Sequence, residues 1–418
     1  MKQIRHRTGA VTEMEQTTAK KNKYEIDMCN GTIMDKLISF SLPLMLSGIL
    51  QLMFNAVDII VVGRFSGSQA LAAVGSTSAL INVFTNLFIG ISLGANVLTA
   101  RFYAAGREKE VSETVHTAIT LALVSGIVMA LVGLVFSKGA LALMGTPDDV
   151  IGLSALYMRI YFLGMPFFML YNYGAAILRA VGDTKRPLYF LIVSGVINAG
   201  LNMFLVIVFS LDVAGVAIAT VVSQAISCVL VLRCLYKSEG RYQLRFSKLC
   251  LKKDYIIPIF QVGIPAGIQS TVINFSNVLL QSSVNSFGSI AMAGYTAANN
   301  VLGFLYTSVN SVTQACMSFT SQNYGVGKYK RMDKVLIDCL ILSSGIALVM
   351  GGGAYLFGTE ILQIYTGDPE VIRCGMEILS ITTVPYFLCG IMDLFPGALR
   401  GMGCSAVPMI PVSYTHLR

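Results

Sequence analysis

Residues 37–62 read LISFSLPLMLSGILQLMFNAVDIIVV, a mostly apolar run in which Asp58 is the one charged side chain. A helix rises 1.5 Å per residue, so about 20 apolar residues cross the roughly 30 Å of hydrocarbon in a bilayer. This run is long enough to do so. It therefore predicts a membrane-spanning helix with a carboxylate inside the bilayer.

Nine further apolar runs of similar length follow. We expect them near 70–100, 115–136, 150–173, 187–209, 214–235, 255–284, 291–319, 335–357 and 371–396, with an eleventh beginning near Val407. The chain is 55% hydrophobic and 12% charged, whereas soluble domains carry about 25% charged residues. The composition indicates an all-α, polytopic membrane protein.

Basic residues indicate the orientation of these helices. In the chain, 25 of the 30 Lys and Arg residues lie in the first segment or in alternate junctions between the runs. Positive loops are retained on the cytoplasmic side, so we expect a multi-pass protein of the cytoplasmic membrane with its N-terminus inside. Residues 1–30 are polar, lack a signal-peptide core, and are expected to form a cytoplasmic tail.

The same distribution argues against other classes of partner. A net charge of +8 is compatible with nucleic-acid binding, but the basic residues form short separated clusters rather than one patch. The nine cysteines contain no CxxC pair, and the three histidines are far apart, so neither a metal site nor a disulfide framework is expected. We expect membrane lipid, rather than nucleic acid or a bound metal, to surround the protein.

The chain repeats itself at a constant offset of 221 residues. Matched pairs include Gly67 with Gly288, Thr99 with Thr320, Tyr103 with Tyr324, Arg179 with Arg400, and Pro187 with Pro408. Such a register predicts two copies of a six-helix unit, parallel because six is even, with a substrate cavity between them.

We therefore expect an N-lobe at 31–236, a basic cytoplasmic linker at 237–254 and a C-lobe at 255–418. The counterparts of residues 188–236 lie mostly beyond residue 418 in this register, so we expect an incomplete C-lobe and ten complete helices. Residues 413–418 are more polar than their counterparts in the first copy.

Polar side chains share one face of the first helix. Gln51, Asn55 and Asp58 recur at i, i+4 and i+7, opposite residues suited to lipid. An ionised group in the bilayer costs about 2.5–3.5 kcal/mol on insertion scales, which makes Asp58 a functional candidate. The alternative is that Asp58 only bonds a neighbouring helix.

Other runs carry amides, hydroxyls and a second acid. These candidates are Asn198, Asn202, Thr220, Asn274, Asn277, Gln281 and Asp393. Their oxygens are suited to ligating a hard cation, and their amides to bonding a carboxylate or joining helices. Asp393 either pairs with a substrate or extends to the inner surface.

Five loop motifs are distinctive: NAVDIIVVGRFSG (55–67), ARFYAAGREKE (100–110), LRAVGDTKRP (178–187), SQNYGVGKYKR (321–331) and LRGMGCSAVP (399–408). In these motifs the chain resembles the multidrug and toxic compound extrusion (MATE) family. The resemblance implies a twelve-helix, two-lobed antiporter that exports small organic cations in exchange for H⁺ or Na⁺ and needs no cofactor.

The resemblance also implies roles for individual residues. The family's cation-binding acid on helix one corresponds to Asp58, and a ligand on helix six corresponds to Thr220. The family's helix-five pattern has Asn and then Asp four residues later. Here the pattern is met by Asn198 and then Asn202, which removes a second carboxylate and leaves the choice between H⁺ and Na⁺ open.

The residues suggest a mechanism and two rivals. Desolvation disfavours a charged carboxylate, so Asp58 is expected to take a proton outside and release it inside, in competition with substrate. A flippase for lipid-linked saccharides is the alternative, although it would require basic residues in the cavity. An enzyme is not expected, because no phosphate-binding loop, GxSxG or HExxH motif occurs. We expect a monomer.

Overall fold

The computed structural model describes residues 24–417, and these are almost entirely helical, with no strand among them. The helices are α2 (Met34–Phe65), α3 (Gly67–Ala104), α4 (Glu108–Leu143), α5 (Asp148–Leu163), α6 (Met165–Ala180), α7 (Lys185–Met203), the π-helical turn η1 (Phe204–Val208), α8 (Asp212–Lys237), the 3₁₀ turn η2 (Phe246–Lys248), α9 (Lys253–Asn285), α10 (Ser289–Gly325), α11 (Tyr329–Leu356), α12 (Gly358–Gln363), α13 (Pro369–Thr382), α14 (Tyr386–Gly401) and α15 (Ala406–Leu417).

Two of the expected helices are broken. The run predicted at 150–173 is the pair α5 and α6, bent by 47°, and the run at 371–396 is the pair α13 and α14, bent by 54°. Pro166 follows the first break and Pro385 lies in the second. Proline cannot donate the helical hydrogen bond and its ring crowds the preceding turn, which explains both bends.

Seven single helices in the described chain are long and apolar enough to cross a membrane, and each bent pair adds one further span. Helix α10 is as long as the others but is less apolar than they are. Its polar residues include Asn299, Asn300, Asn310 and Gln314, which lower its hydropathy. The all-helical membrane fold predicted from the sequence is confirmed.

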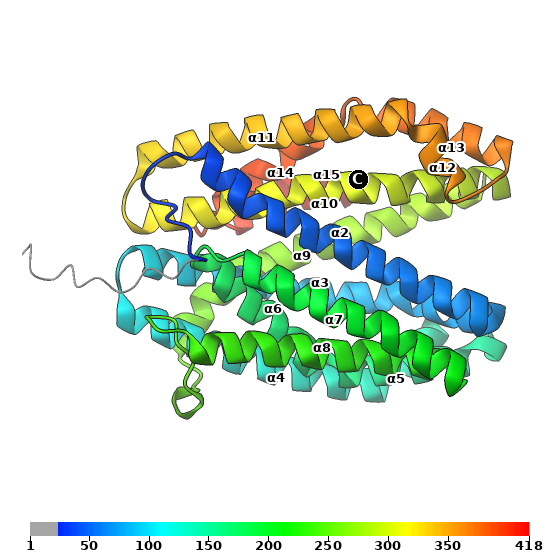
Figure 1. Ribbon diagram of the computed structural model, residues 1–418, viewed down its shortest axis with the longest axis horizontal. Coiled ribbons are helices and arrows are strands. Elements are labelled where there is room, and N and C mark those ends of the chain that lie inside the picture. The colour runs from blue at the N-terminus through cyan, green and yellow to red at the C-terminus, as the bar shows by residue number, and fades with distance from the viewer. Residues whose placement is uncertain (1–23, 418) are drawn as a thin grey trace, which may run out of the picture.

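The ends of the bundle differ in charge. Helix α2 begins at the left in Figure 1, where the junctions α3–α4, α8–α9 and α10–α11 also lie. We call this end the basic end, because these junctions and the helix ends next to them carry most of the Lys and Arg residues in the described chain. The turn between α2 and α3 lies at the opposite end, called the far end.

Helices α3 and α9, from the first and second halves of the chain, approach each other through glycine. A Cβ added to Gly90 would lie 2.4 Å from the Gly267 nitrogen, and one added to Gly263 would lie 2.4 Å from the Ile91 Cα. Only glycine permits such a backbone approach, and small residues four apart are typical of tight helix pairs in membranes. The two halves are therefore in close contact here.

Hydrogen bonds extend this contact toward the basic end. The Ser321 hydroxyl of α10 donates to the Val97 carbonyl of α3 at 2.7 Å, and the Ser318 hydroxyl donates to Asn96 Oδ1 at 3.2 Å. At the basic end itself, a Cβ added to Gly325 of α10 would lie 2.3 Å from the Arg101 carbonyl oxygen of α3. The halves are thus joined most tightly in the basic half of the bundle.

The basic linker is anchored to the first half of the chain. The Arg245 amide donates to His116 Nε2 of α4 at 3.0 Å, and the Lys252 ammonium lies 2.6 Å from Glu113 Oε1. The segment predicted as a linker is therefore docked in part against α4. Of the predicted tail, residues 1–23 lie outside the described residues, whereas residues 24–30 are packed against the bundle.

Candidate functional site

A cavity of about 100 Å³ lies among α2, α6, α7 and α8. It is lined by the whole predicted polar face of α2, that is Gln51, Asn55 and Asp58. Asn198 of α7 and Thr220 of α8 face it from the other side. The structure therefore brings together residues that are up to 169 positions apart in the sequence, counted from Gln51 to Thr220.

Asp58 is hydrogen-bonded within this site. The Asn202 side-chain amide donates to Asp58 Oδ1 and also lies 3.4 Å from Asn198 Oδ1. Asn202 is fully buried, and its own side-chain oxygen has no protein partner. The amide thus supplies a donor to a partly buried carboxylate, while an oxygen acceptor stays unused beside it.

Local backbone features bring α2 against α7. A Cβ added to Gly195 would lie 1.8 Å from the Phe54 ring, so glycine lets the aromatic residue of α2 insert against α7. Helix α7 then ends at Met203 and continues as the π-helical turn η1, which begins two residues beyond Asn202. Wide turns of this kind occur often at functional sites, because they redirect side chains.

Several polar residues of the cavity were not singled out from the sequence. Tyr171, Ser194, Gln224 and Ser227 all line it, and the Tyr161 hydroxyl is hydrogen-bonded to the Gln224 side chain. The sequence of α8 does contain a pattern that predicts two of them. Thr220, Gln224 and Ser227 recur at i, i+4 and i+7 and so share one face of the helix.

The remaining candidates lie apart from this cavity, in the second half of the chain. Asn274, Asn277 and Gln281 are on α9, and Asp393 is on α14. The Asn274 amide donates to the Ser270 carbonyl of its own helix at 2.9 Å. These residues do not line the Asp58 cavity. If they bind a substrate together with residues of α2, they must do so in a second binding region between the halves.

Arg400 differs from its predicted position. It lies four residues beyond the run predicted at 371–396, but it still belongs to the last turn of α14. Its Nη2 donates to Gln269 Oε1 of α9 at 2.8 Å, which places a cation near the polar residues of the second half. Hydropathy places the end of a helix at its last apolar residues. An arginine can nevertheless occupy the last turn, because a positive charge is favourable at a helix C-terminus.

Comparison with known proteins identifies the family. A family model, MatE, matches residues 43–204 and 265–414, which is most of the chain. The chain belongs to the MATE family. The probable multidrug resistance protein YoeA of Bacillus subtilis is 33% identical over 380 residues, covering 89% of this chain and 82% of YoeA. The multidrug export protein MepA of Staphylococcus aureus is 24% identical over 372 residues, with 88% and 81% covered.

Solved structures support the same fold. An outward-facing multidrug resistance MATE family transporter of the MOP superfamily aligns with a TM-score of 0.88 at 19% identity, covering 94% of this chain and 88% of that chain. A MOP superfamily transporter from Pyrococcus furiosus, for which a pocket of reversed polarity and a different function are described, aligns with a TM-score of 0.88 at 20% identity, covering 95% and 89%. The predicted MATE fold is confirmed, and this is a multi-pass membrane protein of a multidrug efflux transporter family.

Four of the MATE-like motifs contain a glycine with positive φ at the basic end, and at two of these glycines, Gly182 and Gly403, another segment passes closely. Gly182 has φ +95°, and a Cβ on it would lie 2.6 Å from the Ile26 nitrogen. Gly403, its counterpart in the repeat, has φ +89°, and a Cβ on it would lie 2.9 Å from Arg101 Nη2. In this MATE protein each glycine thus permits both a left-handed turn and the close passage of another segment.

Proposed function

We propose that this MATE protein exports small organic cations across the cytoplasmic membrane in exchange for protons. The observation that carries the proposal is the Asp58 carboxylate, set in a small cavity within the helices and bonded to the buried Asn202 amide. The names of its relatives, which describe multidrug resistance and multidrug export, support a role in efflux of small organic molecules.

In this proposal, the desolvation of the Asp58 carboxylate couples proton binding to substrate binding. A carboxylate removed from water is costly unless a proton or another cation neutralises it. A proton that enters from outside would neutralise Asp58 and weaken the binding of a cationic substrate. Release of that proton on the inside would restore the charge, and the next substrate cation could then bind.

The cavity is too small to hold a typical drug. Pockets for such ligands measure about 300–1,000 Å³, whereas this one is about 100 Å³. We therefore assign the coupling cation to Asp58, Asn198, Asn202 and Thr220. The substrate is proposed to bind in a larger cavity between the lobes, lined by Gln51, Asn55, Asn274, Asn277, Gln281 and Asp393.

The surroundings of Asp58 favour a proton over sodium as the coupling ion. Hard cations need several oxygen ligands, and a second carboxylate would supply charge as well. Asn202 instead directs an N–H group at Asp58. A proton needs one carboxylate oxygen and no further ligands, so the site can bind it without rearrangement.

We further propose that residues 31–236 and 255–418 are two lobes that rock about the shared cavity, joined by the linker at 237–254. The basic end is assigned to the cytoplasm by its Lys and Arg residues. Because the halves are joined most tightly toward that end, we assign this structure to an outward-facing state. The protein is proposed to act as a monomer surrounded by lipid.

The charge of the cavity argues against a lipid-linked saccharide flippase. A polyanionic headgroup would be held by Lys or Arg side chains. The residues proposed to bind the coupling cation and the substrate include two acids, Asp58 and Asp393, and no Lys or Arg, so they suit a cationic substrate.

Binding of a fluorescent organic cation to the purified protein in nanodiscs tests the proposal. Affinity should fall as the pH is lowered, because a protonated Asp58 no longer attracts the cation. Replacing choline with sodium at constant ionic strength should leave the affinity unchanged. The measurement is a fluorescence titration across pH in each salt.

The variant Asn202→Asp provides a matched control in the same titration. It restores a second carboxylate beside Asp58 at nearly constant volume, so sodium should now weaken dye binding. The proposal is wrong if the unmodified protein already responds to sodium, or if its affinity is independent of pH.

A further inference from the structure

Residues 24–31, YEIDMCNG, run along the basic end of the bundle immediately before α2, and we call them the strap. The strap touches both halves of the chain. Its first residues contact α3, α7 and the linker, whereas its last residues contact α10 and α11. A segment that bridges two bodies can control whether they separate.

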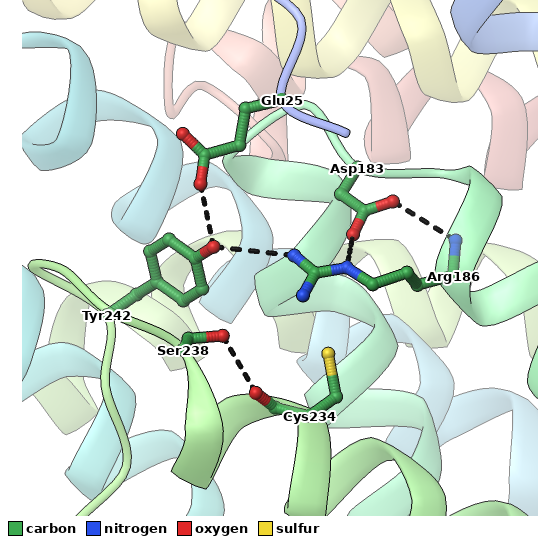
Figure 2. Close-up of polar contacts among 6 residues, drawn as sticks. All are labelled: Glu25, Asp183, Arg186, Cys234, Ser238 and Tyr242. Carbon is green, nitrogen blue, oxygen red and sulfur yellow. Dashed lines mark hydrogen bonds and ion pairs between the residues drawn. The ribbon is translucent and has the colours of Figure 1, made fainter. Parts of the chain in front are cut away.

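The first end of the strap is fastened through Glu25. Its two carboxylate oxygens accept hydrogen bonds from the Tyr103 hydroxyl of α3 and the Tyr242 hydroxyl of the linker, each at 2.7 Å. Figure 2 shows Glu25 directed at Tyr242. Burial and the neighbouring Glu25 carboxylate raise the pKa of Tyr242, so its hydroxyl stays protonated and able to donate.

Tyr242 is itself held in place by the first half of the chain. Arg186 Nη2 donates to the Tyr242 hydroxyl at 3.4 Å, and the same guanidinium is paired with the fully buried Asp183 (Figure 2). Tyr242 is only 1% exposed. Tyr242 is thus held in place by contacts that do not involve the strap.

The second end of the strap is fastened to the other half of the chain by more contacts. Arg331 of α11 donates to the Gly31 carbonyl at 2.9 Å and to the carbonyls of Asn30 and Met28 at 3.1 and 3.2 Å. Asn323 of α10 donates to the Met28 carbonyl at 3.1 Å. Lys328 adds bonds to the next two residues.

Apolar packing strengthens the same end. The Met28 side chain is fully buried in a cluster that includes Phe319 and Val335 of the second half and Leu37 of α2. The start of α2 is therefore bound to the second half together with the strap. If the halves part at the basic end, the end with fewer contacts is the one that detaches.

We propose that the strap is a latch: Glu25 binds Tyr103 and Tyr242 while the basic end is closed, and releases them when that end opens. The latch stabilises the closed state of the basic end relative to the open one. It lies outside the Asp58 site and involves neither the substrate nor the coupling ion.

Hydrogen–deuterium exchange on the full chain in nanodiscs tests the latch without a transport assay. Glu25→Ala should raise exchange in peptides covering 96–104 and 318–325, where α3 and α10 meet at the basic end. We expect about a tenfold shift toward the open state, within the usual range for coupled conformations. Exchange at the far end should stay equal or fall.

A double-mutant cycle assigns the effect to the hydrogen bonds themselves. The variant Tyr103→Phe/Tyr242→Phe removes the donors and leaves the strap intact, so it should give the same shift, and combining it with Glu25→Ala should add nothing further.

Glu108→Gln is the matched control. It removes the 2.9 Å ion pair between Glu108 and Arg241, which also lies at the basic end but joins only the first half and the linker. Its hydrogen–deuterium exchange should match that of the unmodified protein. The latch is excluded if Glu25→Ala leaves exchange unchanged, if the control shifts equally, if the two sets of substitutions add, or if exchange rises at both ends alike.

Discussion

Replacing Asp58 with asparagine is expected to abolish cation export while leaving the protein folded in the membrane. The substitution preserves the size of the side chain and its capacity to hydrogen-bond Asn202, but it removes the charge that binds a proton. A group that cannot gain and lose a proton cannot couple a proton gradient to transport. Export of a fluorescent cation from cells or vesicles, with expression measured alongside, checks this prediction.

An exposed acid at the far end provides the comparison. Glu377 forms an ion pair with Arg373 one helical turn away, and its side chain is 67% exposed. Exposed pairs of this kind contribute little, so Glu377→Gln should export normally. Retained export by Asp58→Asn at normal expression would show that the acid is structural.

Gly94→Ala is expected to reduce export strongly by separating α3 from α9. The added Cβ would lie 2.1 Å from the Ile259 carbonyl oxygen, so one helix must move away from the other. Overpacking costs about 1–3 kcal/mol in a packed interior. A shift of about 1–3 kcal/mol between two conformations changes their ratio by about 5- to 150-fold. Export rate and exchange of the 96–104 peptide are the two readouts.

Gly139→Ala is the control for helix propensity and expression. Gly139 lies within α4, and a Cβ there would meet no atom within 4 Å. This variant should match the unmodified protein or be slightly more stable, since alanine favours helix. Equal export by the two variants would mean that the contact between α3 and α9 tolerates separation and does not hold the closed state.

Hydropathy alone predicted most of the fold. The spans near 37–62 and 214–235 appear as α2 and α8, because one long apolar run makes one straight helix. The breaks between α5 and α6 and between α13 and α14 were missed. Each break lies inside a continuous apolar run. Hydropathy averaged over many residues does not reveal it, because one proline that bends the backbone hardly changes the average.

The candidate site was predictable within a helix but not between helices. Helical spacing placed Gln51, Asn55 and Asp58 on one face, and all three line the cavity. Spacing could not show that Asn202, which is 144 residues later, bonds Asp58, since that pairing depends on how α2 crosses α7.

The strap was beyond the reach of sequence patterns. Residues 24–30 were assigned to a cytoplasmic tail because the segment 1–30 is polar and lacks a signal-peptide core. Most of their bonds to the second half use backbone carbonyls, which every residue type possesses, so no side-chain pattern reveals them.

Transport by the purified protein in vesicles, with the pH gradient and the voltage imposed separately, tests the central claim most directly. One proton inward for one monovalent cation outward moves no net charge, so a voltage term of about 2.3 kcal/mol per 100 mV cancels. A pH gradient at zero voltage should therefore drive uphill export. Uphill export under voltage alone at equal pH, or none under a pH gradient, would contradict a proton exchange carried by the single Asp58 carboxylate.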